Sequence, residues 1–308
     1  MKLIVEVSPH KKADYDICWL MKQVLIGLTP VVLASIIFFR MRAVLLIISC
    51  LLGAVISEEV WMRLRKKPSS LRDYSAVITG ILLALVLPPK LPLWVGFLGG
   101  VVSIILGKQV FGGLGQNIFN PALVGRAFLM AAFPVMLTSW VEPFSLDAVT
   151  KATPLALWKF SKEFTPLKDL FLGNVAGSLG ETSSLAIILG GGYLIIRKIA
   201  DWRAPLGMFL GMSILSGIFY LVNPLQGSIL FHLFSGGALL GMFFMVTDPV
   251  TTPSSKLGRF LFGLFCGFLV IILRKFSGLP EGVMYSILIM NGFTPLINRL
   301  TKPKPLGR

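Results

Sequence analysis

Ten apolar segments, separated by short connections that are polar or rich in glycine and proline, fill most of the 308-residue chain. Each segment predicts a membrane helix, because a helix pairs all its backbone groups internally and a full crossing takes about 20 apolar residues. We therefore predict an all-α integral membrane protein with ten transmembrane helices. The predicted helices span residues 22–39, 43–62, 74–87, 92–106, 118–138, 183–199, 205–222, 228–247, 257–274 and 281–298.

The second half of the chain repeats the first half in sequence. Two glycines, a run of Ile-Ile-Leu and a lysine occur in the same order and spacing near the ends of the fourth and ninth segments. With five helices in each copy, the copies lie in opposite orientations, an arrangement that transporters use to build a site at the bilayer midplane. The matched positions are Gly96, Gly100, Ile104, Ile105, Leu106 and Lys108 in the first copy, and Gly263, Gly267, Ile271, Ile272, Leu273 and Lys275 in the second.

Two predicted helices, the third and the eighth, are short or broken. The third stops at Pro88-Pro89 and is too short for a full crossing, and the eighth ends at Asp248-Pro249. Paired short or proline-broken segments are the best sequence indication of where a transporter-like fold holds its ligand. The fold class is thus two inverted repeats of five helices with broken or short helices 3 and 8.

The chain divides around one long connection. We predict an N-terminal tail at 1–21, a first five-helix repeat at 22–138, a loop at 139–182, a second five-helix repeat at 183–298 and a C-terminal tail at 299–308. Loops of this length in a compact protein tend to be functional or disordered. The loop is rich in Trp and Phe, and this favours packing against other surfaces over disorder.

Composition and charge fit this membrane assignment. The chain is 55% hydrophobic and only 14% charged, whereas a soluble domain carries about 25% charged residues. The net charge of +15 does not indicate nucleic acid, because Lys and Arg concentrate in the connections on one side of the predicted helices. The positive-inside rule then places both termini in the cytoplasm and the 139–182 loop outside the cytoplasmic membrane. Isolated cysteines and histidines indicate neither a metal cluster nor a disulfide framework.

The start of the fifth segment carries three polar residues, Asn117, Asn120 and Arg126. A guanidinium that faces lipid costs about 2.5 kcal/mol or more, so Arg126 needs an acidic partner, backbone carbonyls or a bound anion. Two interpretations stay open. Asn117 caps the helix and Arg126 bonds to a carbonyl of a broken helix, or the three side chains contact a cofactor.

Thr247 and Asp248 stand at the end of the eighth segment, among further threonines. Asp before Pro is ordinary turn chemistry, but hydroxyls, a carboxylate and freed carbonyls also suit a small cation. Both interpretations stay open, and we assign no metal. Glu281, which opens the last segment, would favour the helix dipole at that position.

The outer loop contains the segment Asp147-Ala148-Val149-Thr150-Lys151-Ala152-Thr153-Pro154-Leu155. This pattern predicts a polar turn before a helix, with Thr153 as N-cap and Pro154 at the first helical position. The residues alone do not indicate a modification.

Several long motifs resemble one family, the D subunits of the Rnf complex, an ion-translocating ferredoxin:NAD+ oxidoreductase. The B subunit of the sodium-pumping NADH:quinone oxidoreductase is similar. The resemblance covers nearly the whole chain and implies a urea-transporter-like fold. It also implies partners: other Rnf subunits, among them an extracytoplasmic flavin-bearing subunit. The motifs are Ser8-Pro9-His10, GLGQNIFNPALVGRAF, DAVTKATPL, FMVTDPVTTP and GLPEGVMYSILIMNGFTPLI.

The resemblance further implies covalent FMN, held by a phosphoester to Thr153 and installed by a flavin transferase. Asp147, Thr150 and Ala152 match the attachment motif, whereas Lys151 stands where the family usually has glycine. A second, non-covalent flavin, riboflavin, is implied within the helix bundle, without a motif for its contacts. Arg126, Asn117 and Asn120 are expected to contact flavin and to stabilise its anionic reduced form.

We therefore predict a membrane subunit that relays electrons through flavins and drives Na+ or H+ across the membrane, without a complete activity of its own or a catalytic residue. The sequence has neither a nicotinamide fingerprint nor a cysteine cluster, so those steps belong to partner subunits. It does not distinguish Na+ from H+. The alternative is a cofactor-free, urea-channel-like solute channel, for which the DAVTKATPL motif has no use.

Overall fold

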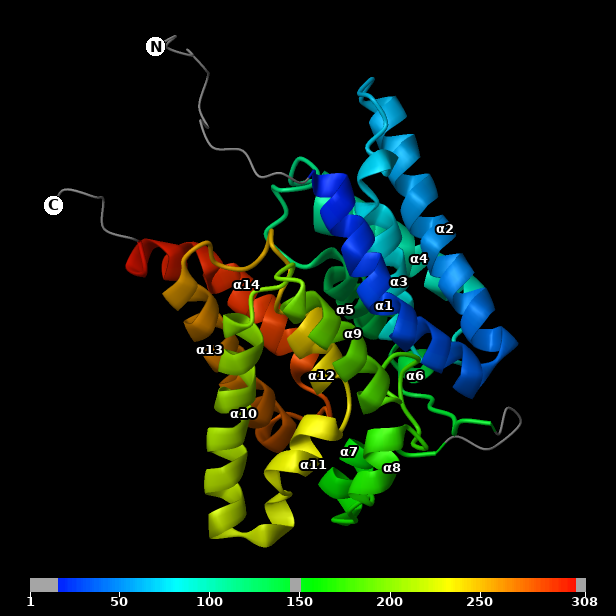
Figure 1. The fold of residues 1–308 in the computed structure, drawn as a ribbon. Coiled ribbons are helices and arrows are strands. Elements are labelled where there is room, and N and C mark those ends of the chain that lie inside the picture. Colours follow the sequence, from blue (N-terminus) through cyan, green and yellow to red (C-terminus); the bar gives the residue numbers. More distant parts are fainter. Residues whose placement is uncertain (1–15, 145–150, 303–308) are drawn as a thin grey trace, which may run out of the picture.

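The computed structural model describes residues 16–144 and 151–302, so Asp147 and Thr150 of the predicted attachment motif lie outside the described residues. Within the described ranges the chain is helical and has no strand (Figure 1). The helices are α1 (Ile17–Phe39), α2 (Met41–Leu64), α3 (Ser75–Leu85), α4 (Leu93–Ile104), α5 (Pro121–Ala132), α6 (Pro134–Leu137), α7 (Pro154–Ala156), α8 (Leu167–Leu172), α9 (Ser184–Ile196), α10 (Arg203–Val222), α11 (Ile229–Phe234), α12 (Ala238–Leu240), α13 (Lys256–Phe276) and α14 (Val283–Leu300).

Four of the described helices, α1, α2, α10 and α13, are long and apolar enough to cross a membrane. The helical segments 224–234 and 238–245 are bent by 48° at a short break, and they make a fifth span if they are counted as one. The remaining predicted segments are also helical, but they are shorter. The arrangement of ten crossings in inverted repeats therefore stays a prediction.

The short and broken segments have clear local causes. α3 has 11 residues and ends at Leu85, before Pro88-Pro89. The eighth segment is broken inside, between α11 and α12, and not only at Asp248-Pro249 as predicted. Gly236 has a φ of +63° at this break, a backbone conformation that glycine adopts without a steric penalty. The fifth segment begins at Pro121 and is interrupted before Pro134, because proline cannot donate to the preceding turn.

Glycines that match between the two sequence copies also meet equivalent backbone in the structure. A Cβ on Gly100 of α4 would lie 2.4 Å from the carbonyl oxygen of Cys50 in α2. A Cβ on Gly267 of α13 would lie 2.3 Å from the carbonyl oxygen of Met208 in α10. Small residues at such positions let two membrane helices approach closely. The repeated glycines thus join α2 to α4 and α10 to α13 in the same way.

The ends of the two equivalent helices, α4 in the first copy and α13 in the second, differ. Residues Ile105–Gln109 form a π-turn after α4, whereas α13 stays α-helical to Phe276. A π-turn inserts one residue into the helical register. Sequence spacing matches Lys108 to Lys275. Because of the inserted residue, the buried basic residue is Lys108 in the first copy but Arg274, one position before Lys275, in the second. Both side chains are buried, although the predicted helix 92–106 leaves Lys108 in a connection.

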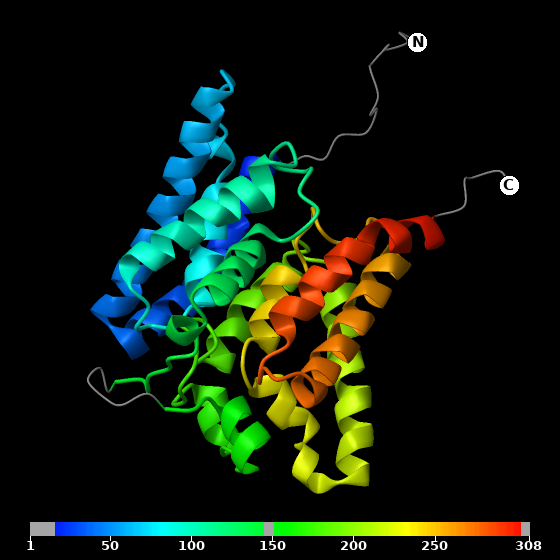
Figure 2. The same cartoon turned by 180° about the vertical axis from the view of Figure 1, so that it is seen from behind.

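The halves share one continuous apolar core, to which α1–α6 and α9–α14 contribute. Leu155 of α7 and Leu170 of α8 belong to a separate small cluster with Trp158 and Phe231. α1 packs on α9 across the halves, where a Cβ on Gly190 would lie 2.0 Å from the carbonyl oxygen of Gly27. In both views α7 and α8 lie at the opposite end of the molecule from the start of α1 and the end of α14 (Figures 1 and 2).

Candidate functional site

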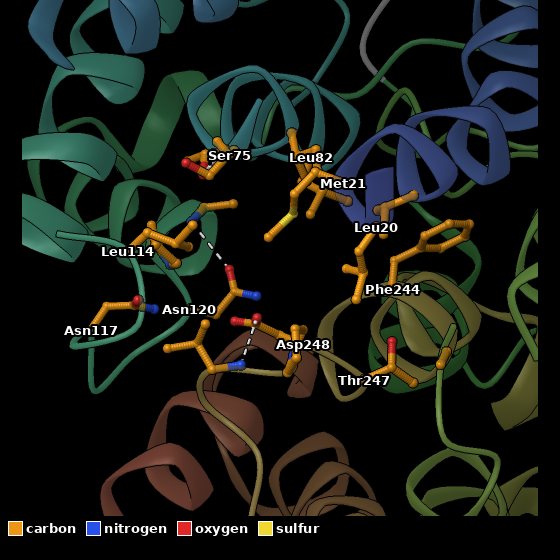
Figure 3. Close-up of a pocket in the computed structure, with 18 of the residues that line it drawn as sticks. Leu20, Met21, Ser75, Leu82, Leu114, Asn117, Asn120, Phe244, Thr247 and Asp248 are labelled. Atoms are coloured by element: carbon orange, nitrogen blue, oxygen red, sulfur yellow. Dashed lines mark hydrogen bonds between the residues drawn. The ribbon is translucent and has the colours of Figure 1, made fainter. Parts of the chain in front are cut away.

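A cavity that we name the Asn120 cavity lies between the two halves (Figure 3). It contains about 800 Å³ of empty space, part of which is open to solvent. Its apolar wall includes Leu20, Met21, Leu82 and Phe244. Its polar lining consists of Ser75, Thr79, Lys108, Asn117, Asn120, Thr247 and Asp248.

Asn120, and not Asn117, caps α5. Its side-chain oxygen accepts from the backbone N–H of Ala122 at 3.1 Å, and its own N–H donates to Oδ1 of Asn291 in α14 at 3.1 Å. Asn117 lies in the preceding connection, where its amide nitrogen donates to the carbonyl of Phe119 at 3.2 Å. Within the described residues, Oδ1 of Asn117 is buried without a hydrogen-bond partner. A buried acceptor of this kind is costly unless a ligand or water satisfies it.

Asp248 forms a turn of the ordinary Asx type. Its carboxylate accepts from the N–H of Val250 at 3.2 Å and from the hydroxyl of Thr251 at 3.0 Å, while the Thr247 hydroxyl donates to the carbonyl of Phe243 at 2.7 Å. Across the described ranges, no group of three or more His, Cys, Asp or Glu side chains is arranged to hold a metal. The turn thus explains these residues, and a cation at Asp248 and Thr247 stays a prediction.

Lys108 and Glu58 form a buried ion pair at the edge of the Asn120 cavity. The ammonium lies 2.7 Å and 2.9 Å from the two carboxylate oxygens and 2.5 Å from the Ser75 hydroxyl. The two side chains are 2% and 0% exposed. Sequence reasoning missed this pair. Two adjacent carboxylates, Glu58 and Glu59, near the end of an apolar segment were the available signal, because such charges in a membrane need partners.

Thr153 caps α7 as predicted. Its hydroxyl accepts from the N–H of Ala156 at 3.2 Å, and Pro154 occupies the first helical position. The neighbouring Lys151 donates its backbone N–H to the carbonyl of Trp140 at 3.1 Å and pairs with Glu142 at 2.6 Å. Ala152 is exposed.

The Thr153 side chain lines two cavities. The Arg126 cavity, with about 500 Å³ of empty space, is formed by Arg126, Met130, Thr138, Trp140, Thr153, Leu279, Pro280, Glu281, Met284 and Tyr285. The Glu181 cavity, with about 350 Å³, is formed by Thr153, Pro154, Leu155, Val175, Ala176, Gly177, Glu181, Phe234 and Gly236. Both volumes include space open to solvent.

Arg126 meets acidic partners, one of the alternatives that the sequence left open. Its Nη2 lies 3.2 Å from Oε2 of Glu281 and its Nη1 lies 3.7 Å from Oε1 of Glu181. Oε1 of Glu281 accepts from the N–H of Gly237 at 2.7 Å, at the break between α11 and α12. Glu281 therefore does more than favour a helix dipole. It joins the start of the last segment to α5 and to the broken helix.

Glu181 is the least satisfied member of this cluster. Its Oε1 has no hydrogen-bond partner in the described part of the chain. It lies in the connection between α8 and α9. Burial, followed by the nearby Glu281 carboxylate, raises the pKa of Glu181 from 4.5 to about 8, although Arg126 acts in the opposite direction. Sequence patterns do not single out this residue, since Glu181 is one of several charges in the predicted loop.

The predicted flavin contacts fall into two places. Asn117 and Asn120 line the Asn120 cavity, whereas Arg126 lines a different cavity together with Thr153. Asn120 caps α5, Asn117 lies in the connection before it, and Arg126 lies inside the helix. Their contact with a flavin stays a prediction. Four residues of a helix rise about 6 Å. Ala122 and Arg126, which line the two cavities, are thus neighbours along one helix.

Comparison with known proteins shows the family. The chain matches the NQR2, RnfD, RnfE family over residues 4–307, and it belongs to that family, as the motifs indicated. It is 42% identical to the D subunit of the Na(+)-translocating ferredoxin:NAD(+) oxidoreductase complex of Acetobacterium woodii. The match covers 100% of this chain and 96% of that relative. It is 39% identical to the D subunit of the proton-translocating ferredoxin:NAD(+) oxidoreductase complex of Clostridium ljungdahlii, covering 98% of this chain and 96% of the relative.

A more distant relative is the D subunit of the ion-translocating oxidoreductase complex of Halorhodospira halophila, 36% identical over 98% of this chain and 94% of the relative. The relatives' names include both sodium and proton translocation. Together with the apolar helices, this family places the chain among multi-pass membrane proteins.

Proposed function

We propose that this chain is the flavin-carrying membrane subunit of an ion-translocating ferredoxin:NAD+ oxidoreductase complex. The observation that carries the proposal is that Thr153 and Arg126 line the same cavity. The names of the relatives supply the complex and its overall reaction. Other subunits of that complex would be its partners, including an extracytoplasmic one with its own flavin.

The first part of the proposal is covalent FMN on the Thr153 hydroxyl, installed by a flavin transferase. Thr153 is partly exposed on a docked turn, and this favours access by a modifying enzyme. The Arg126 cavity beside it offers an indole, a phenol and two thioether side chains, and these suit a flat aromatic group. Arg126 adds positive charge on the same wall, which favours a ligand that becomes negative on reduction.

The second part is a non-covalent flavin, riboflavin, in the Asn120 cavity. Oδ1 of Asn117 is a buried acceptor in need of a donor, and a ring N–H or ribityl hydroxyl would satisfy it. Asn120 holds its position through α5 and Asn291. Lys108, paired with Glu58, supplies a cation at the rim.

Flavins supply one- and two-electron redox chemistry when bound. The chain's part is to hold two such groups close together, since the two cavities lie about one helical turn apart along α5. In the Arg126 cavity, the Glu181 carboxyl lies beside the ion pair of Arg126 and Glu281, and a change in the charge of a ligand there would alter its protonation. We propose that this response contributes to the movement of Na+ or H+ in the complex.

The proposed membrane arrangement follows the sequence: ten crossings in two inverted repeats, both termini cytoplasmic, and the 139–182 loop outside the cytoplasmic membrane. The equivalent glycine contacts in α4 and α13 support the repeat. The position of α7 and α8, far from the start of α1 and the end of α14, supports opposite sides for loop and termini (Figure 1).

Flavin content tests this function and the alternative of a cofactor-free solute channel together. Protein made with a flavin transferase is expected to be yellow, with one flavin released on denaturation and one retained. Thr153→Ala is expected to lose only the retained flavin. Thr138→Ala, a matched change in the same cavity, is expected to keep both. A folded, colourless protein that conducts a small solute would support the channel instead.

A further inference from the structure

The side chain of Lys159 ends in a group of backbone carbonyls after α13. Its Nζ lies 2.8 Å from the carbonyl oxygen of Arg274 and 3.0 Å from that of Leu279, and it also donates to the carbonyl of Ser277. A lysine ammonium has three donors. All three find a carbonyl oxygen, and no carboxylate takes part in these bonds.

The position of these carbonyls gives them a strong negative potential. α13 runs from Lys256 to Phe276, and the last carbonyls of a helix lack intrahelical partners and carry the negative end of its dipole. The chain then turns so that the carbonyl of Leu279 faces the same point as those of Arg274 and Ser277. Convergent carbonyl oxygens are the ligands that replace the hydration shell of K+ in selective pores.

We propose that the carbonyls of Arg274, Ser277 and Leu279 form a site for a monovalent cation, which this chain fills with the ammonium of its own Lys159. The ligand class is a weakly hydrated cation of ammonium size, such as K+. The tethered ammonium makes the protein independent of the free ion.

The consequence is a fixed geometry beside Thr153. Thr153 caps the same short helical turn that carries Lys159, and the connection that holds the ammonium continues into Leu279, Pro280 and Glu281 of the Arg126 cavity. On its other side the turn is held by Trp158, whose indole N–H donates to the carbonyl of Leu225 at 3.1 Å. Lys159 thus ties the turn with Thr153 to the opposite wall of that cavity.

The neighbouring Lys162 provides a matched control. Its ammonium lies over the ring of Trp158, 5.5 Å from the centroid, rather than among these carbonyls. Removal of Lys162 deletes the same charge from the same segment and leaves the carbonyl site filled.

The test replaces the ammonium and asks whether a free ion substitutes for it. The thermal unfolding midpoint of Lys159→Met is measured in KCl and in choline chloride at equal ionic strength. We expect a midpoint several degrees below that of the parent protein in choline, with saturable recovery on addition of KCl. The parent protein and Lys162→Met are expected to show no difference between the two salts. The planar guanidinium of Lys159→Arg does not match three convergent carbonyls. We expect this variant to have an unfolding midpoint between those of the parent protein and Lys159→Met in choline, without an increase on addition of KCl.

Three results would overturn the proposal. The first is a Lys159→Met protein as stable as the parent in choline. The second is a loss of stability that KCl does not restore beyond choline, which would reduce Lys159 to an ordinary helix cap. The third is failure to obtain this variant folded in KCl, since K+ should then replace the ammonium. The measurement needs no flavin on Thr153, so its outcome is independent of the proposed function.

Discussion

The Nη2 atom of Arg126 lies 3.2 Å from Oε2 of Glu281, and this contact joins α5 of the first half to the connection just before α14 in the second. Both residues line the cavity that contains Thr153. The ion pair therefore belongs both to the connection between the halves and to the candidate flavin site.

Replacement of Arg126 by Met is expected to destabilise the protein by about 3 kcal/mol, the lower end for a broken buried pair, because the partly buried Glu281 loses its ion-pair partner and keeps only Arg274 nearby. The double variant Arg126→Met with Glu281→Gln is expected to recover a large part of this loss. Thermal unfolding of the two single variants and the double variant measures the coupling. Additive losses in the double variant would show that the two residues do not act as a pair.

The pH dependence of stability is expected to reveal Glu181. Its carboxyl has a pKa of about 8 in the folded protein and an ordinary value of 4.5 otherwise. Between these values the unfolded chain has released the proton and the folded chain still holds it, so stability falls as pH rises from 4.5 to about 8. The groups that face this carboxyl are Arg126 and Glu281, with Arg274 nearby.

Glu181→Gln is expected to remove this decline. The difference in unfolding free energy between the variant and the parent protein should therefore increase in favour of the variant from about pH 5 to about pH 8. Unfolding midpoints across that range provide the measurement, with Glu142→Gln, an exposed carboxylate in the outer loop, as the control. An equal slope in the parent protein and Glu181→Gln would exclude Glu181 as the source.

Lys108→Met is expected to destabilise the protein by about 3–5 kcal/mol through the buried Glu58 that it leaves unpaired. Replacement of both residues, Lys108→Met with Glu58→Leu, is expected to be less harmful than Lys108→Met alone, since well-packed apolar residues replace buried ion pairs at little cost. Arg63→Met breaks an exposed pair with Glu59 and is expected to cost less than about 1 kcal/mol. If Lys108→Met proves as mild as Arg63→Met, the buried pair contributes no more than a surface one.

Occupation of the Asn120 cavity is tested by filling it. Leu82 lines this cavity from α3, and Leu82→Trp is expected to reduce the flavin released on denaturation while the flavin retained on the chain is unchanged. Leu45→Trp, at an exposed position of α2, serves as the matched control. Unaltered release from Leu82→Trp would place the non-covalent flavin elsewhere.

Local features of the fold could be predicted from the sequence because they depend on neighbouring residues. Thr153 before Pro154 predicts an N-cap, and this is confirmed. The apolar segments predict helices, and helices are found in them. The position of Asn120 as the cap of α5, rather than Asn117, follows from Pro121, which favours the first helical position.

Tertiary partnerships could not be predicted, because they join distant parts of the chain. Arg126 clearly needs a partner, but nothing in the sequence selects Glu181 and Glu281 over carbonyls or an anion. The separation of the asparagines from Arg126 depends on which walls the two halves supply to each cavity. The π-turn at Ile105–Gln109 shifts Lys108 by one position, a change that spacing in sequence does not reveal.

The central claim is that Thr153 carries a flavin. Mass analysis of the peptide that contains Thr153, from protein made together with a flavin transferase, tests it most directly. The predicted result is the mass of that peptide plus FMN joined with loss of water, with fragment ions that assign the addition to Thr153. An unmodified Thr153 in otherwise yellow, folded protein, or the addition on Thr150 instead, would contradict the account.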